Sequence, residues 1–247
     1  MTHSPNLEVV FTPEMFKYFE NPEANVVVVD VLRATSAICT AFKNEVSEMI
    51  PVPSLEEARK YKQQGYIVAA ERDGNVLDFA DFGNSPYNFT PERVKNKQVA
   101  YSTTNGTKAI HIARNSQMVI IGSFINLSAV ANLLINKEKD VIILCAGWKG
   151  KFCLEDTLFA GALSEILLDS NKFQTICDST KASVDLWSLA KPDIISYVDK
   201  VAQRKRLKKL GLDDVIEYCH TPDSAEEIPV YQNGKIKEYN KTASIPD

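Results

Sequence analysis

Short apolar, β-branched runs alternate along this chain with segments of helical periodicity, which is the pattern of parallel β-α-β units. The run at 26–29 contains no polar position, which predicts a strand buried on both faces. Further strands are predicted at 49–52, 66–70, 99–102, 118–121 and 140–145, and helices at 35–44, 54–64, 105–114, 126–135 and 155–169. We expect the segment beyond 170 to be mostly helical and the polar tail beyond Gly234 to be frayed.

This pattern predicts an α/β fold with a mostly parallel sheet flanked by helices and a largely helical C-terminal third. Residues 71–97 interrupt the pattern with glycine and proline among polar side chains, and loops of this length in compact domains usually carry function. A chain of 247 residues can form one unit or two α/β lobes. The sequence marks no lobe boundary, so we take 1–247 as one unit.

Composition and charge narrow the classes of partner. The chain carries 28 Lys and Arg against 32 Asp and Glu, a net charge of −4, which argues against a general electrostatic grip on nucleic acid. Five cysteines without a CxxC pair predict reduced thiols and a cytoplasmic location. We expect neither an export signal nor membrane association, because no apolar run is long enough to cross a bilayer. An apolar helix face has the same sequence pattern whether it packs in a core or in an interface between subunits. The sequence therefore does not decide whether the protein forms a homo-oligomer.

Ligands in open α/β sheets bind outside the carboxyl ends of the strands. Mostly polar residues, with one cysteine and one glycine, stand at the carboxyl ends of the predicted strands or soon after them. They are Asp30, Arg33 and Thr35 after the first strand, Glu71, Arg72 and Asp73 after the third, the segment 103–107 after the fourth, and Cys145 and Gly147, then Glu155 and Asp156, after the last. We therefore expect the functional site among these residues.

The segment 103–107, Thr-Thr-Asn-Gly-Thr, suits an oxyanion. Its hydroxyl and amide donors would crowd a helix N-terminus, whose free N–H groups and dipole attract phosphate. Gly106 would let the backbone approach a ligand closely. A plain Thr or Asn N-cap is the structural alternative.

The carboxylates at the strand ends are candidate metal ligands. They are Asp30, Glu71, Asp73, Glu155 and Asp156. Hard oxygen ligands around phosphate oxygens are the usual way to hold Mg²⁺, although each carboxylate is alternatively a cap or a surface charge. Arg33 and Arg72 lie within a few residues of a carboxylate, as expected of a site that neutralises a polyanion or of a simple ion pair.

Several familiar motifs are absent. Asp30 is not followed by a second Asp two residues on, and Lys151 rather than Arg stands six residues after Cys145, which excludes the haloacid-dehalogenase motif and the tyrosine-phosphatase loop. The chain has neither GxGxxG nor GxxxxGK[ST]. We expect Cys145 to be a buried small hydrophobe rather than a nucleophile.

A basic run at 204–209 lies outside the predicted strand ends. It precedes Gly211 and fits a helix C-terminus, where cations complement the helix dipole. A binding patch is the alternative.

Seven segments together resemble the ComB family, the 2-phosphosulfolactate phosphatases. They are 28–35 (VVDVLRAT), 51–52 (PV), 71–72 (ER), 82–86 (FGNSP), 103–107 (TTNGT), 145–147 (CAG) and 155–156 (ED), and a weaker segment at 210–219 extends the match. Each is weak alone, whereas seven in register are specific. The resemblance implies a Mg²⁺-dependent phosphatase that cleaves (2R)-2-phospho-3-sulfolactate to 3-sulfolactate and phosphate, a step in coenzyme M biosynthesis.

The residues and the resemblance together give a hypothesis for the site. The implied substrate is a small phosphoester that carries phosphate, carboxylate and sulfonate, so an acidic protein needs clustered donors and a metal to hold it. The expected catalytic residues are Asp30, Arg33, Glu71 and Arg72, and the expected Mg²⁺ ligands are Asp30, Glu71 and Asp156, with Glu155 in reserve. The expected substrate-binding residues are Thr35, Asn84, Ser85, Thr103, Thr104, Asn105, Gly106, Thr107, Cys145 and Gly147.

Two mechanisms stay open at this point. In one, Mg²⁺ and a carboxylate position a water for in-line attack; in the other, Asp30 attacks phosphorus and forms an aspartyl-phosphate. We favour the water, because no Asp-x-Asp partner is present to act as general acid. The rival functions are a phosphatase for another 2-hydroxy-acid phosphate and a non-catalytic binder of phosphorylated metabolites.

Overall fold

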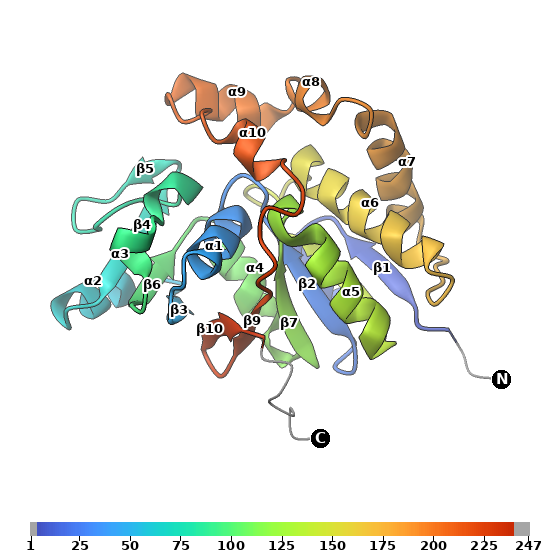
Figure 1. The fold of residues 1–247 in the computed structure, drawn as a ribbon, viewed down its shortest axis with the longest axis horizontal. Coiled ribbons are helices and arrows are strands. Elements are labelled where there is room, and N and C mark those ends of the chain that lie inside the picture. Colours follow the sequence, from blue (N-terminus) through green and yellow to red (C-terminus); the bar gives the residue numbers. More distant parts are fainter. Residues whose placement is uncertain (1–3, 240–247) are drawn as a thin grey trace.

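The computed structural model describes residues 4–239, which form a ten-stranded mixed sheet with helices packed on its faces (Figure 1). The strands are β1 (Leu7–Val10), β2 (Asn25–Val29), β3 (Glu48–Pro51), β4 (Ile67–Arg72), β5 (Asn75–Val76), β6 (Gln98–Ser102), β7 (Met118–Gly122), β8 (Val141–Cys145), β9 (Pro229–Gln232) and β10 (Lys235–Glu238). The α-helices are α1 (Ala34–Lys43), α2 (Leu55–Gln63), α3 (Pro91–Val94), α4 (Gly106–Ile112), α5 (Leu127–Lys137), α6 (Leu154–Asp169), α7 (Asp178–Ala190), α8 (Ile194–Val198), α9 (Ala202–Lys209) and α10 (Ile216–Cys219). Short 3₁₀ helices occupy Pro13–Tyr18, Pro86–Asn88, Ala113–Asn115 and Phe124–Asn126. The predicted α/β fold, with its mostly parallel sheet and largely helical C-terminal third, is confirmed.

Two groups of parallel strands make up the sheet. The first contains β1, β8, β2 and β7, and the second contains β3, β6 and β4. The C-terminal hairpin β9–β10 lies between the groups, antiparallel to β7 on one side and to β3 on the other. The last strands of the chain therefore join its two halves into one sheet, and the division into domains stays a prediction.

For residues 235–238 the hairpin corrects the expectation of a frayed tail beyond Gly234, whereas 240–247 lie outside the described residues. In β10 only Ile236 is fully buried, while Lys235 and Lys237 turn the other way. Their ammonium groups reach the buried carboxylate of Glu48, at 2.6 Å for Lys235 and 3.6 Å for Lys237. Such a short alternation is a weak strand signal, and its ionic partner lies 187 residues earlier in the chain.

Two other elements differ from the predicted boundaries. β1 was not predicted, because Glu8 interrupts its short apolar run, yet it pairs in parallel with β8 at the sheet edge. β4 extends through Glu71 and Arg72, which were expected to follow the strand. The predicted loop 71–97 contains β5, a 3₁₀ turn and the one-turn helix α3.

The predicted burial of β2 on both faces is confirmed. Val27 and Val29 belong to a core formed with α5, α6 and α7, whereas Val26 and Val28 belong to a core formed with α1 and α4. Alternate side chains of a strand point to opposite faces, so helices must cover both. This packing leaves the strand ends, with their loops, as the place for polar chemistry.

All five cysteines are free, as expected, and Cys39, Cys145 and Cys219 are buried. Within residues 4–239, no helix has the length and apolar character that a bilayer crossing requires.

His220 is a buried titratable group at the end of α10. Its ring packs against Phe124 with the ring centroids 5.6 Å apart. Its Nδ1 donates to the carbonyl of Ile216 at 2.7 Å, while Nε2 has no partner in the described part of the chain. Burial lowers the pKa of His220 from 6.5 to about 4.

We therefore expect His220 to make the fold less stable in acid. The imidazole of the unfolded chain takes up a proton near pH 6.5, whereas the folded one stays neutral until about pH 4. The contribution of neutral His220 is complete above pH 6.5 and is lost as the pH falls toward 4. Between pH 7.0 and 4.5, urea unfolding should show that the wild type loses about 2–3 kcal/mol more stability than His220→Gln.

The matched control is His111→Gln, because His111 is exposed on α4. That variant should lose stability on acidification as the wild type does. An equal acid loss in the wild type and in His220→Gln would contradict the assignment to His220.

Candidate active site

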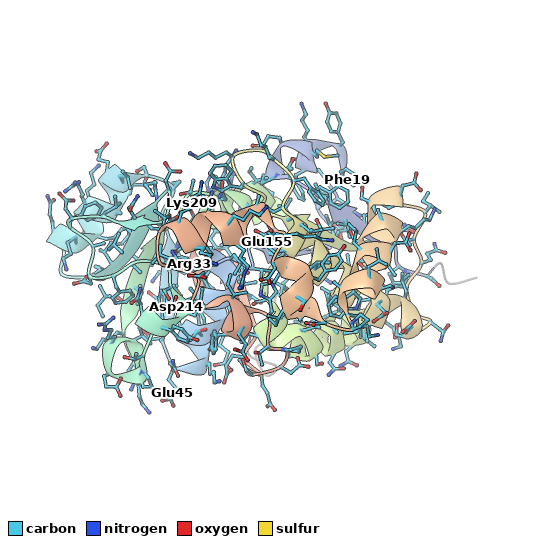
Figure 2. All side chains as sticks on the ribbon, turned by 90° about the horizontal axis from the view of Figure 1, so that it is seen from above. Phe19, Arg33, Glu45, Glu155, Lys209 and Asp214 are labelled. Atoms are coloured by element: carbon cyan, nitrogen blue, oxygen red, sulfur yellow. The ribbon has the colours of Figure 1, made fainter. Side chains whose placement is uncertain are left out.

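The polar strand ends meet in a narrow pocket that residues from both parallel groups line. Its lining residues are Asp30, Leu32, Arg33, Glu71, Asp73, Gly74, Asn84, Thr104, Asn105, Gln203, Arg206 and Leu207. Figure 2 looks down on this side of the molecule, where Arg33 and Glu155 lie near the middle, close to the helix that ends at Lys209. The cavity is about 20 Å³, room for about one water molecule, so a substrate can enter only if covering residues move.

Asp30 lies directly after β2 and is only 9% exposed. Its backbone N–H donates to Oγ1 of Thr35 at 3.0 Å, and its Oδ1 accepts from the N–H of Ala34 at 3.3 Å. Burial is the main reason that the pKa of Asp30 rises to about 6, with a further rise from the charge of Glu71. The hydrogen bond from Ala34 and the charge of Arg206 oppose this rise. Asp30 therefore binds the N-terminus of α1 and also faces the pocket.

Gly106 brings the start of α4 against Asp30. A Cβ on Gly106 would lie 2.5 Å from Cβ of Ala34 and 3.1 Å from Oδ2 of Asp30. No other residue fits this close contact between the starts of α1 and α4. The absence of a side chain at Gly106 thus serves the packing around Asp30, where the sequence suggested approach to a ligand.

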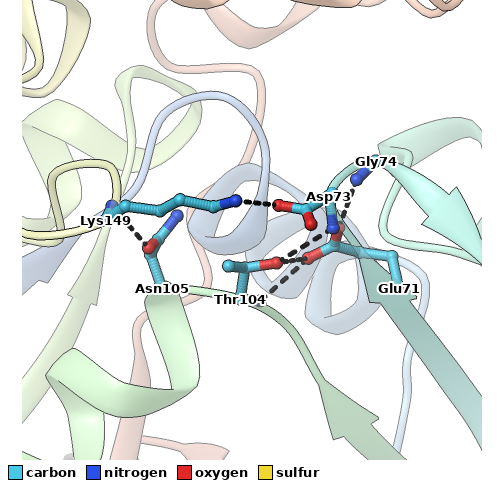
Figure 3. Close-up of polar contacts among 6 residues, drawn as sticks. All are labelled: Glu71, Asp73, Gly74, Thr104, Asn105 and Lys149. Atoms are coloured by element: carbon cyan, nitrogen blue, oxygen red, sulfur yellow. Dashed lines mark hydrogen bonds and ion pairs between the residues drawn. The ribbon is translucent and has the colours of Figure 1, made fainter.

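Glu71 has both carboxylate oxygens occupied by protein donors (Figure 3). Oε1 accepts from the N–H of Thr104 at 2.9 Å and from its hydroxyl at 3.1 Å, and Oε2 accepts from the N–H of Gly74 at 2.8 Å. The backbone N–H of Asp73 donates in turn to Oγ1 of Thr104 at 3.3 Å. Glu71 therefore holds the turn after β4 against the segment after β6.

Glu155 and Asp156, in the first turn of α6, are both buried but have different partners. Asp156 accepts from the N–H of Val31 at 2.9 Å and from that of Gly147 at 3.1 Å, so it fixes the loops after β2 and β8. Glu155 keeps Oε2 without a hydrogen-bond partner among the described residues. Burial, and then the charge of Asp30, raise the pKa of Glu155 to about 7.

These contacts decide which carboxylates fit a cation. Among residues 4–239, no group of three or more His, Cys, Asp or Glu side chains is arranged to hold a metal ion. Glu155 does not line the pocket, but it has a free oxygen, and the charge of Asp30 raises its pKa, so these two carboxylates remain as candidates for a divalent cation. Mg²⁺ commonly takes one or two carboxylates together with substrate phosphate and water. The oxygens of Glu71 and Asp156 are already bonded to backbone N–H groups.

Arg33 and Arg72 have different environments. Arg33 lines the pocket, is only 4% exposed and makes no side-chain hydrogen bond or ion pair within the described chain. Arg72 donates from Nη1 to the carbonyl of Glu71 at 2.6 Å and from Nη2 to Oγ of Ser102 at 2.9 Å, and it does not line the pocket. Arg33 is thus the guanidinium available to an anion, whereas Arg72 braces β4 against β6.

The residues of segment 103–107 have two kinds of role: two of them bond to each other at the start of α4, and two line the pocket. Thr103 accepts at Oγ1 from the N–H of Thr107 at 3.3 Å, and the Thr107 hydroxyl donates to the Thr103 carbonyl at 3.1 Å, which is the capping alternative. Thr104 and Asn105 line the pocket. Oδ1 of Asn105 accepts from the N–H of Lys149 at 3.2 Å.

Lys149 continues this contact along the rim of the pocket. Its Nζ lies 2.7 Å from Oδ1 of Asp73, while its backbone N–H is held by Asn105 (Figure 3). The loop after β8 is thereby linked to the turn after β4. Both side chains of the ion pair are about half exposed, so we assign it little stability.

The remaining predicted residues lie around the pocket rather than in it, except Asn84. Asn84 lines the pocket, is 7% exposed and has Oδ1 without a partner among the described residues. Thr35 donates its hydroxyl to the Asp30 carbonyl. Ser85 and Cys145 do not line the pocket, and burial raises the pKa of the Cys145 thiol well above its ordinary value.

Helix α9 supplies pocket residues that were not expected from the sequence. Gln203 donates from Nε2 to the Leu32 carbonyl at 3.0 Å, and the Arg206 guanidinium lies over the Trp148 ring, 4.1 Å from its centroid. At the other end, Leu210 packs so closely on Gly74 that an added Cβ there would lie 2.7 Å from its Cδ1. The basic run does end a helix, as predicted, but its Arg206 also faces the pocket.

Known proteins resemble this chain over nearly its whole length. A model of the 2-phosphosulpholactate phosphatase family matches residues 10–234. Proteins named probable 2-phosphosulfolactate phosphatase are 37% identical in Caldanaerobacter subterraneus, over 87% of this chain and 90% of the relative, and 38% identical in Thermotoga petrophila, over 86% and 92%. The relative of the same name in Clostridium novyi is 34% identical over 93% of this chain and 98% of its own. The matched range includes every residue that lines the pocket.

Proposed function

This chain belongs to the 2-phosphosulpholactate phosphatase family, and on that premise we propose that it hydrolyses (2R)-2-phospho-3-sulfolactate to 3-sulfolactate and phosphate. Family membership makes it a phosphoric monoester hydrolase. One observation supports this site for the reaction: the same pocket contains the buried carboxylate of Asp30 and the buried guanidinium of Arg33, which has no hydrogen-bond or ion-pair partner among residues 4–239. The free cysteines support the expectation of a cytoplasmic enzyme.

The phosphoryl group is proposed to bind against Arg33. A guanidinium can donate two parallel hydrogen bonds to phosphoryl oxygens, and burial strengthens them because water does not compete. Asn84 lines the same pocket and can offer its amide N–H₂ group to the ester. Thr104 and Asn105, at the start of α4, add polar groups on the side of the second parallel group.

Asp30 and Glu155 are proposed to hold a divalent cation, which we take to be Mg²⁺. This cation would supply neutralisation of the phosphoryl charge and a more acidic bound water. The free Oε2 of Glu155 and the rise in its pKa caused by the charge of Asp30 support this pair. Asp156 and Glu71 would act by fixing the loops that carry the pocket residues.

Asp30 is proposed to orient the attacking water rather than to attack phosphorus itself. Its carboxylate lies at the end of β2 and lines the pocket, where an oxygen can accept a hydrogen bond from that water. Arg33 would hold the phosphoryl group in line with that water. The covalent route through Asp30 makes a different prediction, because it leaves a phosphorylated enzyme during turnover.

Phosphate release tests the proposed reaction. We expect racemic 2-phospho-3-sulfolactate to release phosphate in the presence of Mg²⁺, with at least about a tenfold lower kcat/KM for 2-phospholactate and with no release in EDTA, because the missing sulfonate removes a charged contact. Faster release from 2-phospholactate would favour a different 2-hydroxy-acid phosphate as substrate. Folded protein that releases phosphate from neither compound would favour a non-catalytic binder.

A further inference from the structure

Arg206 is a second cation of the pocket and forms no ion pair with a described carboxylate, although Asp30, Glu71 and Glu155 are near enough for their charges to raise its pKa against the effect of burial. It lies on α9, opposite the strand ends, and lines the pocket together with Asp30 and Arg33. Its Nε and Nη1 atoms are buried and have no hydrogen-bond partner within residues 4–239. No carboxylate of that range lies within ion-pair distance of it, although its neighbour Arg204 pairs with Asp199 at 2.7 Å. Buried donors of a charged group without acceptors are costly, so they indicate a missing anion.

The surroundings of Arg206 fix where its guanidinium lies. The plane rests on the Trp148 ring at 4.1 Å, a contact that restricts the rotamer and leaves the N–H donors at the edge of the group. Helix α9 is itself anchored near this point by the hydrogen bond from Gln203 to Leu32. Arg206 is therefore pre-positioned, which lowers the entropy lost when it binds a ligand.

The substrate of the proposed reaction has more than one anionic group. Its phosphoryl group must lie near Asp30, and Arg33 follows Asp30 on the same strand-end loop. A carboxylate and a sulfonate then remain, and neither takes part in bond cleavage. Arg206 lines the same pocket from α9 instead of from the strand-end loop, so it can bind one of these groups while Arg33 binds the phosphoryl group.

We propose that Arg206 binds the non-reacting sulfonate or carboxylate of the substrate and thereby determines specificity, while Arg33 binds the phosphoryl group. The proposal rests on the proposed function, since it concerns the same pocket. It gives α9 a role in substrate recognition. The helix carries the cation that selects a phosphoester with both a carboxylate and a sulfonate over one that lacks either group.

Binding of the product tests this role without turnover. Isothermal titration calorimetry with 3-sulfolactate and Mg²⁺ would compare the wild type with Arg206→Gln, Arg206→Lys and the control Lys205→Gln, whose side chain is exposed on the same helix. We expect the dissociation constant to rise about 30-fold or more in Arg206→Gln, less in Arg206→Lys, and to stay unchanged in the control. Thermal unfolding of each variant would establish that it is folded.

Two shorter ligands identify the group that Arg206 binds. Lactate lacks the sulfonate, and 2-hydroxyethanesulfonate lacks the carboxylate. If Arg206→Gln weakens only 2-hydroxyethanesulfonate, the residue binds the sulfonate; if it weakens only lactate, the residue binds the carboxylate. The proposal is overturned if 3-sulfolactate binds folded Arg206→Gln as it binds the wild type, or if the wild type does not bind it.

Phosphate release by the same proteins separates this proposal from the function on which it rests. Wild-type hydrolysis together with unchanged product affinity in Arg206→Gln would reject the role of Arg206 and keep the function. Product binding that depends on Arg206, without hydrolysis by the wild type, would reject the function and keep the role.

Discussion

Asp30→Asn is expected to lower kcat at least about 10³-fold, a loss of about 4 kcal/mol of transition-state stabilisation. Asn is nearly the same size and can still accept the hydrogen bond from Ala34, but it cannot take up a proton or carry a negative charge toward a cation. Either proposed route for the reaction therefore stops. Steady-state phosphate release with saturating substrate and Mg²⁺ measures the effect.

The fold of Asp30→Asn should be intact. Because burial raises the pKa of Asp30 to about 6, the ionised carboxylate is unfavourable in the folded protein at neutral pH, and a neutral amide removes that cost. The matched control is Asp78→Asn, since Asp78 is an exposed partner of Arg59. A variant that keeps more than about a tenth of kcat, less than 1.4 kcal/mol of loss, would exclude Asp30 from the central chemistry. Mass spectrometry of quenched wild-type enzyme would detect phosphorylated Asp30 if the covalent route operates.

Arg33→Gln is expected to raise KM about 100-fold, equivalent to roughly 3 kcal/mol, with a further loss in kcat. The side chain is buried in the pocket and has no side-chain partner in the described part of the protein, so its N–H groups are available to the phosphoryl group. Arg33→Lys should recover only part of the loss, because an ammonium cannot donate the two parallel bonds of a guanidinium. Steady-state kinetics with each variant measures both constants.

Arg72→Gln is the contrasting control for Arg33. Arg72 donates to the Glu71 carbonyl and to Ser102, so its replacement should lower the free energy of urea unfolding by about 1–3 kcal/mol. Arg33→Gln, which breaks no such bond, should leave that free energy unchanged or raise it. An unchanged KM in Arg33→Gln would place phosphoryl binding elsewhere in the pocket.

The sequence predicted the sheet, and it placed the candidate site at the strand ends, because both inferences follow from short-range patterns. The unbroken apolar run of β2 reports burial on two faces, and in an α/β fold the polar residue after it, Asp30, then lies at the ligand-binding edge. The segment 103–107, predicted to bind phosphate, lies at the start of α4 as expected, but Thr103 and Thr107 bond to each other there and Asn105 is the N-cap residue.

The sequence does not show which of two adjacent polar residues contributes to the candidate site. Glu71 and Arg72 are successive residues of β4, so their side chains leave opposite faces of the sheet and only Glu71 reaches the pocket. Glu155 and Asp156 are successive residues of a helix, about 100° apart around its axis, and only the structure shows which of them keeps a free oxygen. The contribution of Arg206 depends on the tertiary placement of α9, which no local pattern encodes.

The place of the β9–β10 hairpin has a consequence for how this protein is made. Synthesis runs from the N-terminus, so β7 and β3 are complete long before the two strands that pair with them leave the ribosome. Until then both are open sheet edges, with Ile120 and Met49 among their apolar residues, and such edges readily pair with other chains. A nascent or truncated chain that ends before Pro229 therefore has two unpaired sheet edges, and β9 and β10, the last two strands within residues 4–239, protect it from aggregation.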